Sequence, residues 1–262
     1  MSAGAGGLLR RSLAQTSWLV LIALLSIATL AWLYLLLGAG MDMEHAGMAM
    51  TEPMAMPWTP ALAGLMFLMW AVMMVAMMLP SAAPMLLTFD TMAKRRREQG
   101  QPGASTFAFA LGYLAVWFAF SAGATGLQYL LEQLLLLSMQ MRASSAAFAG
   151  ALLIGAGLYQ LTPWKLACLR HCQSPLGFIM SHWREGTIGA LAMGWRHGLY
   201  CLGCCWLLMG LLFVGGVMNL AWIAALSLYV LVEKLVPAVH WLARGAGIAL
   251  IAWGAFILGR TL

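Results

Sequence analysis

Charged side chains are scarce in this sequence. They make up 8% of the 262 residues, whereas 63% are hydrophobic, and a soluble globular domain carries roughly 25% charged residues. The scarcity therefore excludes a soluble globular protein. Apolar runs of about 18 residues recur along the chain, which is typical of transmembrane helices, and no alternating ten-residue pattern suggests a membrane barrel.

Several signatures of chemistry are also missing. The sequence contains no nucleotide-binding loop, no serine-nucleophile elbow, no paired carboxylates within an apolar run and no C-x₂-C…C-x₂-C zinc signature. Nothing therefore indicates an enzyme. The net charge of +6 would suggest nucleic acid in a soluble protein, but here it reflects membrane topology, so we expect no nucleic-acid partner.

The apolar runs predict an all-α, polytopic transmembrane bundle of about seven spans that forms a single membrane domain over residues 1–262. The spans are approximately 18–37, 61–80, 106–128, 145–162, 192–213, 217–235 and 245–261. The longest polar breaks are an outer loop at 38–60 and an inner loop at 163–191. Pro80 and Pro84 predict a break or kink at the inner end of the second span.

The distribution of basic residues predicts the orientation. With the N-terminus inside, Arg142 and Arg260 are the only two of the 14 Lys and Arg residues that fall outside. The positive-inside rule then places the N-terminus inside and the C-terminus outside, in a bacterial inner membrane. The first apolar run, at about 20 residues, exceeds a signal-peptide core of 7–15 and favours a retained span. Glu233 and Lys234 are interpreted as an interfacial ion pair at the inner end of the sixth span.

The stretch HGLYCLGCCW (197–206) carries a histidine and three of the five cysteines. At 100° per residue, His197, Cys201, Cys204, Cys205 and the preceding Met193 occupy one helix stripe about 120° wide. Small residues also allow close helix packing, which is the alternative explanation. Because clustered cysteines on a cytoplasmic side are more often metal-binding or redox-active than disulfide-bonded, we interpret the stripe as a soft-metal site.

A second cluster precedes this stripe, in YQLTPWKLACLRHCQSP (159–175). Thr162 is predicted to cap a short helix that begins at Pro163 and ends before Pro175. On this helix its candidate ligands share a face; they are Cys168, His171 and Cys172. The nearby basic side chains favour thiolate over thiol.

Methionine is abundant, with 21 residues. Soft thioether and imidazole ligands in the outer loop suggest capture of Cu(I); they are Met41, Met43, His45, Met48, Met50, Met54 and Met56. In the second span, Met69, Met73 and Met77 follow helical spacing and Met78 widens the stripe. They form either a metal relay or ordinary core packing.

The sequence resembles a bacterial and archaeal family of predicted metal-binding integral membrane proteins of unknown function. The resemblance rests on AMMLPSAAPM (76–85), YQLTPWKLACLRHC (159–172), CLGCCWLLM with GGVMNL (201–220) and EKLVP (233–237). Trp164 stands where the family pattern has Leu. The resemblance implies metal binding by Cys168, Cys172, Cys201, Cys204 and Cys205, and it supplies no reaction.

Three functions follow as hypotheses. The first is transport, storage or delivery of Cu(I), with zinc as a possible alternative metal and a periplasmic metallochaperone or a membrane cuproenzyme as partner. The second is a thiol–disulfide electron conduit in which CLGC (201–204) exchanges with Cys168 or Cys172. The third is a structural or assembly subunit in which a metal joins two helices.

Overall fold

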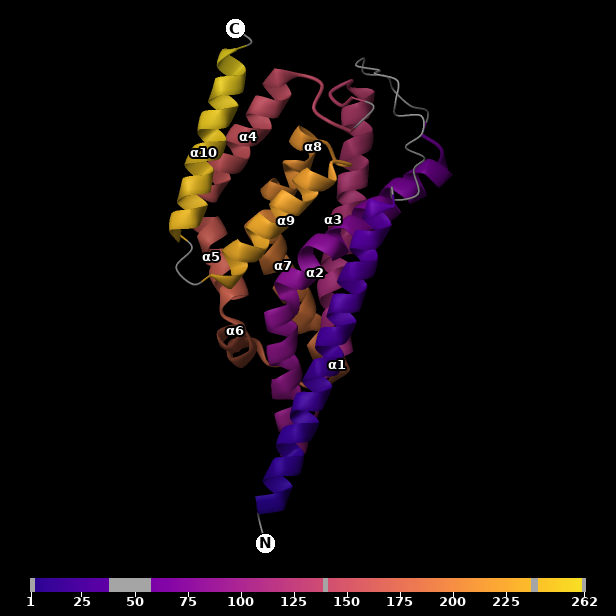
Figure 1. Ribbon diagram of the computed structural model, residues 1–262, viewed down its shortest axis with the longest axis vertical. Coiled ribbons are helices and arrows are strands. Elements are labelled where there is room, and N and C mark those ends of the chain that lie inside the picture. The colour runs from indigo at the N-terminus through magenta and orange to yellow at the C-terminus, as the bar shows by residue number, and fades with distance from the viewer. Residues whose placement is uncertain (1–2, 38–57, 139–140, 237–239, 261–262) are drawn as a thin grey trace.

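The computed structural model describes residues 3–37, 58–138, 141–236 and 240–260, and these are helical almost throughout (Figure 1). The helices are α1 (Ala3–Leu36), α2 (Pro60–Glu98), α3 (Thr106–Gln133), α4 (Ala146–Gln160), α5 (Pro163–Gln173), α6 (Pro175–His182), α7 (Gly186–Gly210), α8 (Leu212–Gly215), α9 (Leu220–Leu235) and α10 (His240–Gly259). The expected ligands of the outer loop lie outside the described residues; they are Met41, Met43, His45, Met48, Met50, Met54 and Met56.

Five helical segments of the described chain are long and apolar enough to cross a membrane. They belong to α1, α2, α3, α7 with α8, and α10, and a sixth arises if α4 and α5, which meet at a 65° bend, cross together. The predicted sixth span corresponds to α9, whose 16 residues fall short of the roughly 20 that a perpendicular crossing needs. The predicted all-helical fold is thus confirmed for the described residues, with five or six helices long and apolar enough to cross a membrane, and the number of seven spans stays a prediction.

Helix α2 continues through both of its prolines and changes direction along its length, so of the predicted break or kink the structure has the kink (Figure 1). Pro80 has no N–H to donate to the carbonyl of Ala76. Trp32 of α1 replaces that donor, since its indole Nε1 lies 3.2 Å from the Ala76 oxygen. A neighbouring helix therefore satisfies the freed backbone group, as membrane burial requires.

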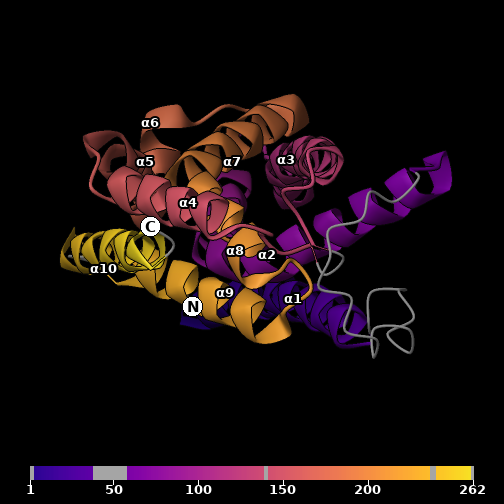
Figure 2. The same ribbon diagram turned by 90° about the horizontal axis from the view of Figure 1, so that it is seen from above.

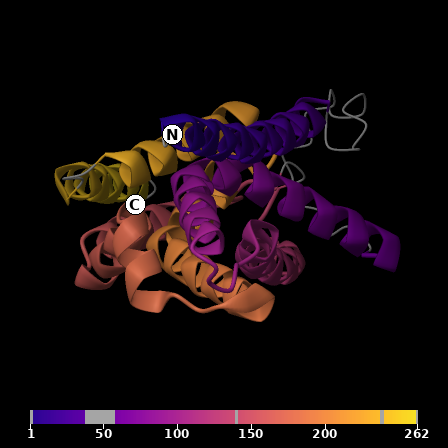
Figure 3. The same ribbon diagram turned by 90° about the horizontal axis from the view of Figure 1, so that it is seen from below.

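The helices are arranged around α2. Seen from above and from below, α1 and α9 lie on one side of α2, α3 and α7 lie on the other, and α10 packs against α4 at the edge of the bundle (Figures 2 and 3). Helices α3 and α7 approach closely because of glycine: a Cβ at Gly194 would lie 1.9 Å from the Phe109 carbonyl oxygen, and one at Gly112 would lie 2.1 Å from that of Leu191. Such small-residue contacts hold membrane helices together.

The predicted inner loop at 163–191 contains α5, α6 and the start of α7. Thr162 caps α5 as predicted, with its hydroxyl accepting from the Lys165 N–H at 3.3 Å, and Pro163 occupies the first turn. Pro175 ends α5 and opens α6, also as predicted. The cap and the prolines together turn the chain back across α7.

Candidate functional site

Three cysteines of α7 are buried in the centre of the molecule. Cys201, Cys204 and Cys205 are each 1% exposed. The thiols of Cys204 and Cys205 donate to the Cys201 carbonyl oxygen at 3.0 and 2.9 Å, which turns both side chains back along the helix. The predicted stripe therefore faces protein rather than lipid.

Helix α5 places its candidate ligands at different points along α7. The Cys172 thiol lies near the thiols of Cys201 and Cys204. Cys168 instead packs against α7 beside Gly203, where a Cβ would lie 2.9 Å from its Sγ.

The third candidate ligand of α5, His171, engages a different part of α7. Its ring stacks on Tyr200 with a centroid separation of 4.2 Å, and its Nδ1 lies 2.9 Å from the Ala167 oxygen. The imidazole therefore makes aromatic and backbone contacts, and among the described residues it forms no hydrogen bond with the thiols.

Helices α2 and α3 close the other side of the thiols. Met78 is fully buried, and its Sδ lies 4.0 Å from the Cys205 Sγ. The Tyr113 hydroxyl lies 3.2 Å from the Cys201 Sγ and donates to the Met78 carbonyl oxygen at 3.1 Å. We call the five sulfur-bearing side chains the sulfur cluster; they are Met78, Cys172, Cys201, Cys204 and Cys205.

A lysine from α9 points into the sulfur cluster. The Lys234 Nζ donates to the Cys201 Sγ at 2.9 Å and to the Ser81 Oγ at 3.0 Å, and it lies 3.9 Å from the Met78 Sδ. Its neighbour Glu233 points elsewhere and is fully buried. The predicted interfacial pair is therefore wrong, because successive helical residues diverge by about 100° and these two have different partners.

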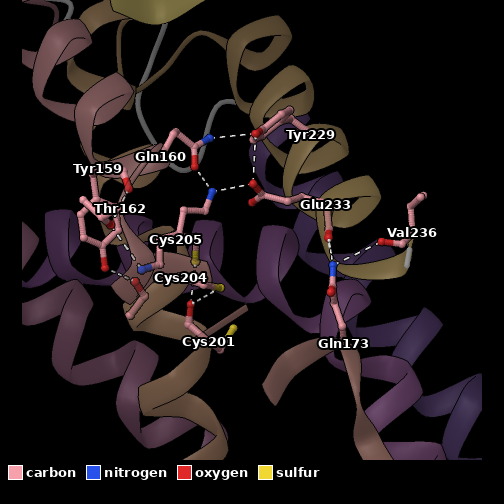
Figure 4. A network of polar contacts seen from close by, with 12 residues as sticks. Tyr159, Gln160, Thr162, Gln173, Cys201, Cys204, Cys205, Tyr229, Glu233 and Val236 are labelled. Atoms are coloured by element: carbon pink, nitrogen blue, oxygen red, sulfur yellow. Dashed lines mark hydrogen bonds and ion pairs between the residues drawn. The ribbon is translucent and has the colours of Figure 1, made fainter. Parts of the chain in front are cut away.

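Glu233 belongs to a second buried network at the bend between α4 and α5 (Figure 4). The Lys165 Nζ lies 2.5 Å from the Glu233 Oε1 and also donates to the Gln160 Oε1. The Tyr229 hydroxyl donates to the Glu233 Oε1 at 3.1 Å and accepts from the Gln160 Nε2 at 2.8 Å. Gln173 then caps the end of α9 by donating to the Glu233 carbonyl oxygen at 2.8 Å.

His197 is buried beside the sulfur cluster in an aromatic surround. Its ring stacks on Tyr113 at 5.6 Å and meets the edge of Phe178 at 5.4 Å. Its Nδ1 is buried and has no hydrogen-bond partner among the described residues. Met193, one turn earlier, is also buried, but its Sδ accepts from the Arg184 N–H at 3.2 Å.

The predicted methionine stripe of α2 faces the interior. Met69, Met73 and Met77 are each 1% exposed and lie in the main hydrophobic core. Nearer the N-terminus of the same helix, Met66 accepts from the Gln128 Nε2 at 3.5 Å. Buried thioethers therefore occur along α2 from Met66 to Met78, where the thiols begin.

The donor set of this region is soft. Thiols, a thioether and an imidazole favour Cu(I) over hard cations. Among the described residues, no three or more His, Cys, Asp or Glu side chains already stand in the arrangement of a formed metal site. The sulfur atoms nevertheless come together from α2, α5 and α7. The thiols of Cys204 and Cys205 now donate to the Cys201 carbonyl oxygen, and rotation about χ1 would turn them toward a bound metal.

Some site residues escaped the sequence analysis. Lys234 and Glu233 were placed at a membrane surface, and Met78 was treated as the margin of a stripe. No sequence pattern indicated that Tyr113 would contact Cys201 or that Lys165 would pair with Glu233. The EK pair within an apolar run was the available signal for Lys234, since buried charges in a membrane mark function.

Comparison with protein families agrees with these chemical features. The chain matches the family model PpoB2, described as a copper chaperone, over residues 67–257. That range contains α3 to α9 and all five cysteines. No curated protein and no solved structure matches the chain significantly. On the family match, the chain belongs to the PpoB2 copper-chaperone family.

Proposed function

We propose that this protein is an inner-membrane copper chaperone that holds Cu(I) in the sulfur cluster and passes it to another protein. One observation carries the proposal: side chains from three separate helices bring together three buried thiols, the half-buried thiol of Cys172 and a buried thioether. Ordinary packing does not require that chemistry at the meeting point of α2, α5 and α7. The family match supports copper as the cargo.

Within the cluster we assign Cys201 and Cys205 as the primary ligands. They are one helical turn apart, and the Cys205 thiol donates to the Cys201 carbonyl oxygen at 2.9 Å. Met78 faces Cys205 from α2 and is the third ligand, which gives Cu(I) a soft, low-coordinate site. Cys172 and Cys204 form the adjacent pair, and they receive or supply the metal on the side of α5.

The proposed route runs along α2. The outer loop with Met41 to Met56 captures copper, the thioethers of Met69, Met73 and Met77 line the way inward, and Met78 delivers it to the thiols. Cys168 and His171 lie beyond Cys172 and are secondary ligands, while His197 is an auxiliary ligand. Met193 is the most distant candidate, because its sulfur already accepts a backbone N–H.

The single membrane domain is proposed to cross the bilayer about seven times. In this topology α4 and α5 together form one bent crossing, and α9 forms one short crossing. Figure 1 supports this topology, because α1 begins at one end of the molecule and α10 ends at the other. The basic residues at the end of α2 lie at the same end as the start of α1. The positive-inside rule then makes that end cytoplasmic, and a periplasmic metallochaperone or a membrane cuproenzyme is the proposed exchange partner.

Copper stoichiometry tests the proposal. Protein purified under reducing conditions and loaded with Cu(I) is expected to retain about one copper per chain after desalting. The C201S/C204S/C205S variant is expected to lose it, whereas M180S, which removes an exposed sulfur side chain of α6 outside the proposed route, is the control and keeps it. Equal copper in the wild type and the triple variant, measured by elemental analysis, would refute the proposal.

A thiol–disulfide conduit is the second candidate, and the position of Cys172 favours it. A disulfide between Cys172 and Cys201 or Cys204 requires two thiols to give up two protons and two electrons to an acceptor disulfide or quinone. Alkylation shifts after oxidation and reduction would detect this bond, and C172S would abolish it. Deleting residues 41–56 separates the functions, because copper uptake is expected to weaken while thiol exchange is expected to continue.

A further inference from the structure

Lys234 is a buried ammonium group held by two sulfur acceptors and one hydroxyl acceptor. The side chain is 6% exposed. An ammonium has three N–H donors, and three acceptors surround this one: Cys201 at 2.9 Å, Ser81 at 3.0 Å and Met78 at 3.9 Å. The hydrogen bonds orient the charge onto the sulfur cluster but do not neutralise it.

The other buried lysine of the described chain is neutralised. Lys165 forms an ion pair with Glu233, and Lys94 forms one with Asp90. Among the described residues, no carboxylate lies within ion-pair distance of Lys234. A buried charge without a counter-charge is costly, so the ammonium of Lys234 favours one net negative charge on the sulfur cluster.

We propose that Lys234 balances the charge of the metal-loaded sulfur cluster and thereby makes it prefer a monovalent cation over a divalent one. This inference rests on the proposed function. When Cu(I) binds, two thiols each lose a proton to water and two copper–sulfur bonds form, which gives a complex of charge −1. With Lys234 the total is zero.

A divalent cation on the same two thiolates gives a different sum. The complex is then neutral, and Lys234 remains an uncompensated positive charge. Coulomb interactions at a few ångströms are strong where water is excluded, so the lysine favours Cu(I) and Ag(I) and disfavours Zn(II). Lys234 is a positioning residue in this scheme, because it acts through Cys201 and does not bind the metal.

The experiment fixes the number of thiolates first. In a C172S/C204S background, Cys201 and Cys205 are the only thiols left in the sulfur cluster, so no metal recruits a third thiolate from it. K234M and K234Q remove the charge in this background, K234R retains it, and Arg95→Met is the control for the loss of an exposed basic residue. Cu(I), Ag(I) and Zn(II) affinities are measured by competition with chromophoric chelators in detergent at one pH.

Removal of the charge is expected to weaken Cu(I) and Ag(I) binding by about 10- to 100-fold, the range found when partners of metal ligands are removed. Zn(II) binding is expected to stay the same or to strengthen, and K234R and the Arg95 control are expected to keep the original preference. Two neutral variants are used so that failure of one to fold does not decide the result.

Four results would overturn the inference. Unchanged Cu(I) affinity in K234M and K234Q would show that the charge has no role, and an equal loss of Cu(I) and Zn(II) would show a role in packing alone. A two-thiol protein that binds no Cu(I), although the wild type does, would refute the two-thiolate assignment. If the wild type itself takes up no Cu(I), the proposed function fails together with the inference.

Discussion

The buried pair of Lys165 and Glu233 predicts a strong and non-additive loss of stability on mutation. The two side chains are 0% and 1% exposed, and their charged atoms lie 2.5 Å apart. Replacing Lys165 by Met leaves the carboxylate buried with only the Tyr229 hydroxyl on its Oε1, while its Oε2 already lacks a partner among the described residues. Breaking a buried pair in this way costs about 3–5 kcal/mol.

The double variant K165M/E233L is expected to behave differently. Removing both charges at once leaves no uncompensated ion, and replacement of a buried pair by apolar side chains is often neutral. If each single variant loses about 3–5 kcal/mol, additivity would give roughly 6–10 kcal/mol. We expect the double variant to lose no more than about 2 kcal/mol, which is a coupling energy of several kcal/mol.

Reversible unfolding in mixed micelles, followed by tryptophan fluorescence, measures these free energies. The exposed Arg95→Met serves as a control for loss of a basic residue and is expected to change stability by less than about 0.5 kcal/mol. A double variant as unstable as the sum of the single variants would refute the reasoning, because it would show that the two charges do not compensate each other in the folded protein.

Three other substitutions test the packing and the site. Gly194→Ala is expected to lower the melting temperature and to destabilise the fold by about 1–3 kcal/mol or more, because the new Cβ would lie 1.9 Å from the Phe109 oxygen; normal stability would contradict the close approach of α3 and α7. Trp32→Phe is expected to cost about 1 kcal/mol by leaving the Ala76 carbonyl without its indole donor, with thermal unfolding as the measurement. Met78→Leu conserves volume, so we expect near-normal stability but about tenfold weaker Cu(I) binding in chelator competition; wild-type affinity would exclude Met78 as a ligand.

Much of the fold was accessible from the sequence because membrane helices obey local rules. Hydrophobic length predicts where helices run, since every backbone group must be satisfied within the helix. The α5 boundaries followed from Thr162, Pro163 and Pro175, whose effects on capping and on backbone donors are local. The burial of the α7 stripe was also predictable, because its periodicity is a property of one helix.

The contacts between helices were not accessible in the same way. The spacing of the methionines in α2 predicts which of them share a face of the helix. The course of the helix through its two prolines determines which of them reaches the thiols. The kinked helix brings Met78 to Cys205, and its freed carbonyl is satisfied by α1. Neither the direction of a kink nor the identity of the facing helix is encoded in the spacing of one segment.

The adjacent residues Glu233 and Lys234 show why the site depends on the whole bundle. Their side chains diverge by about 100°, so one turn of α9 contacts the bend of α5 through Lys165 and the thiol of α7 through Cys201. The carboxylate satisfies one lysine and leaves the other without a counter-charge. Since both lysines are buried, the pairing of one and the isolation of the other cannot be read from net charge. The position of the α9 backbone between α5 and α7 decides which positive charge is available to a thiolate.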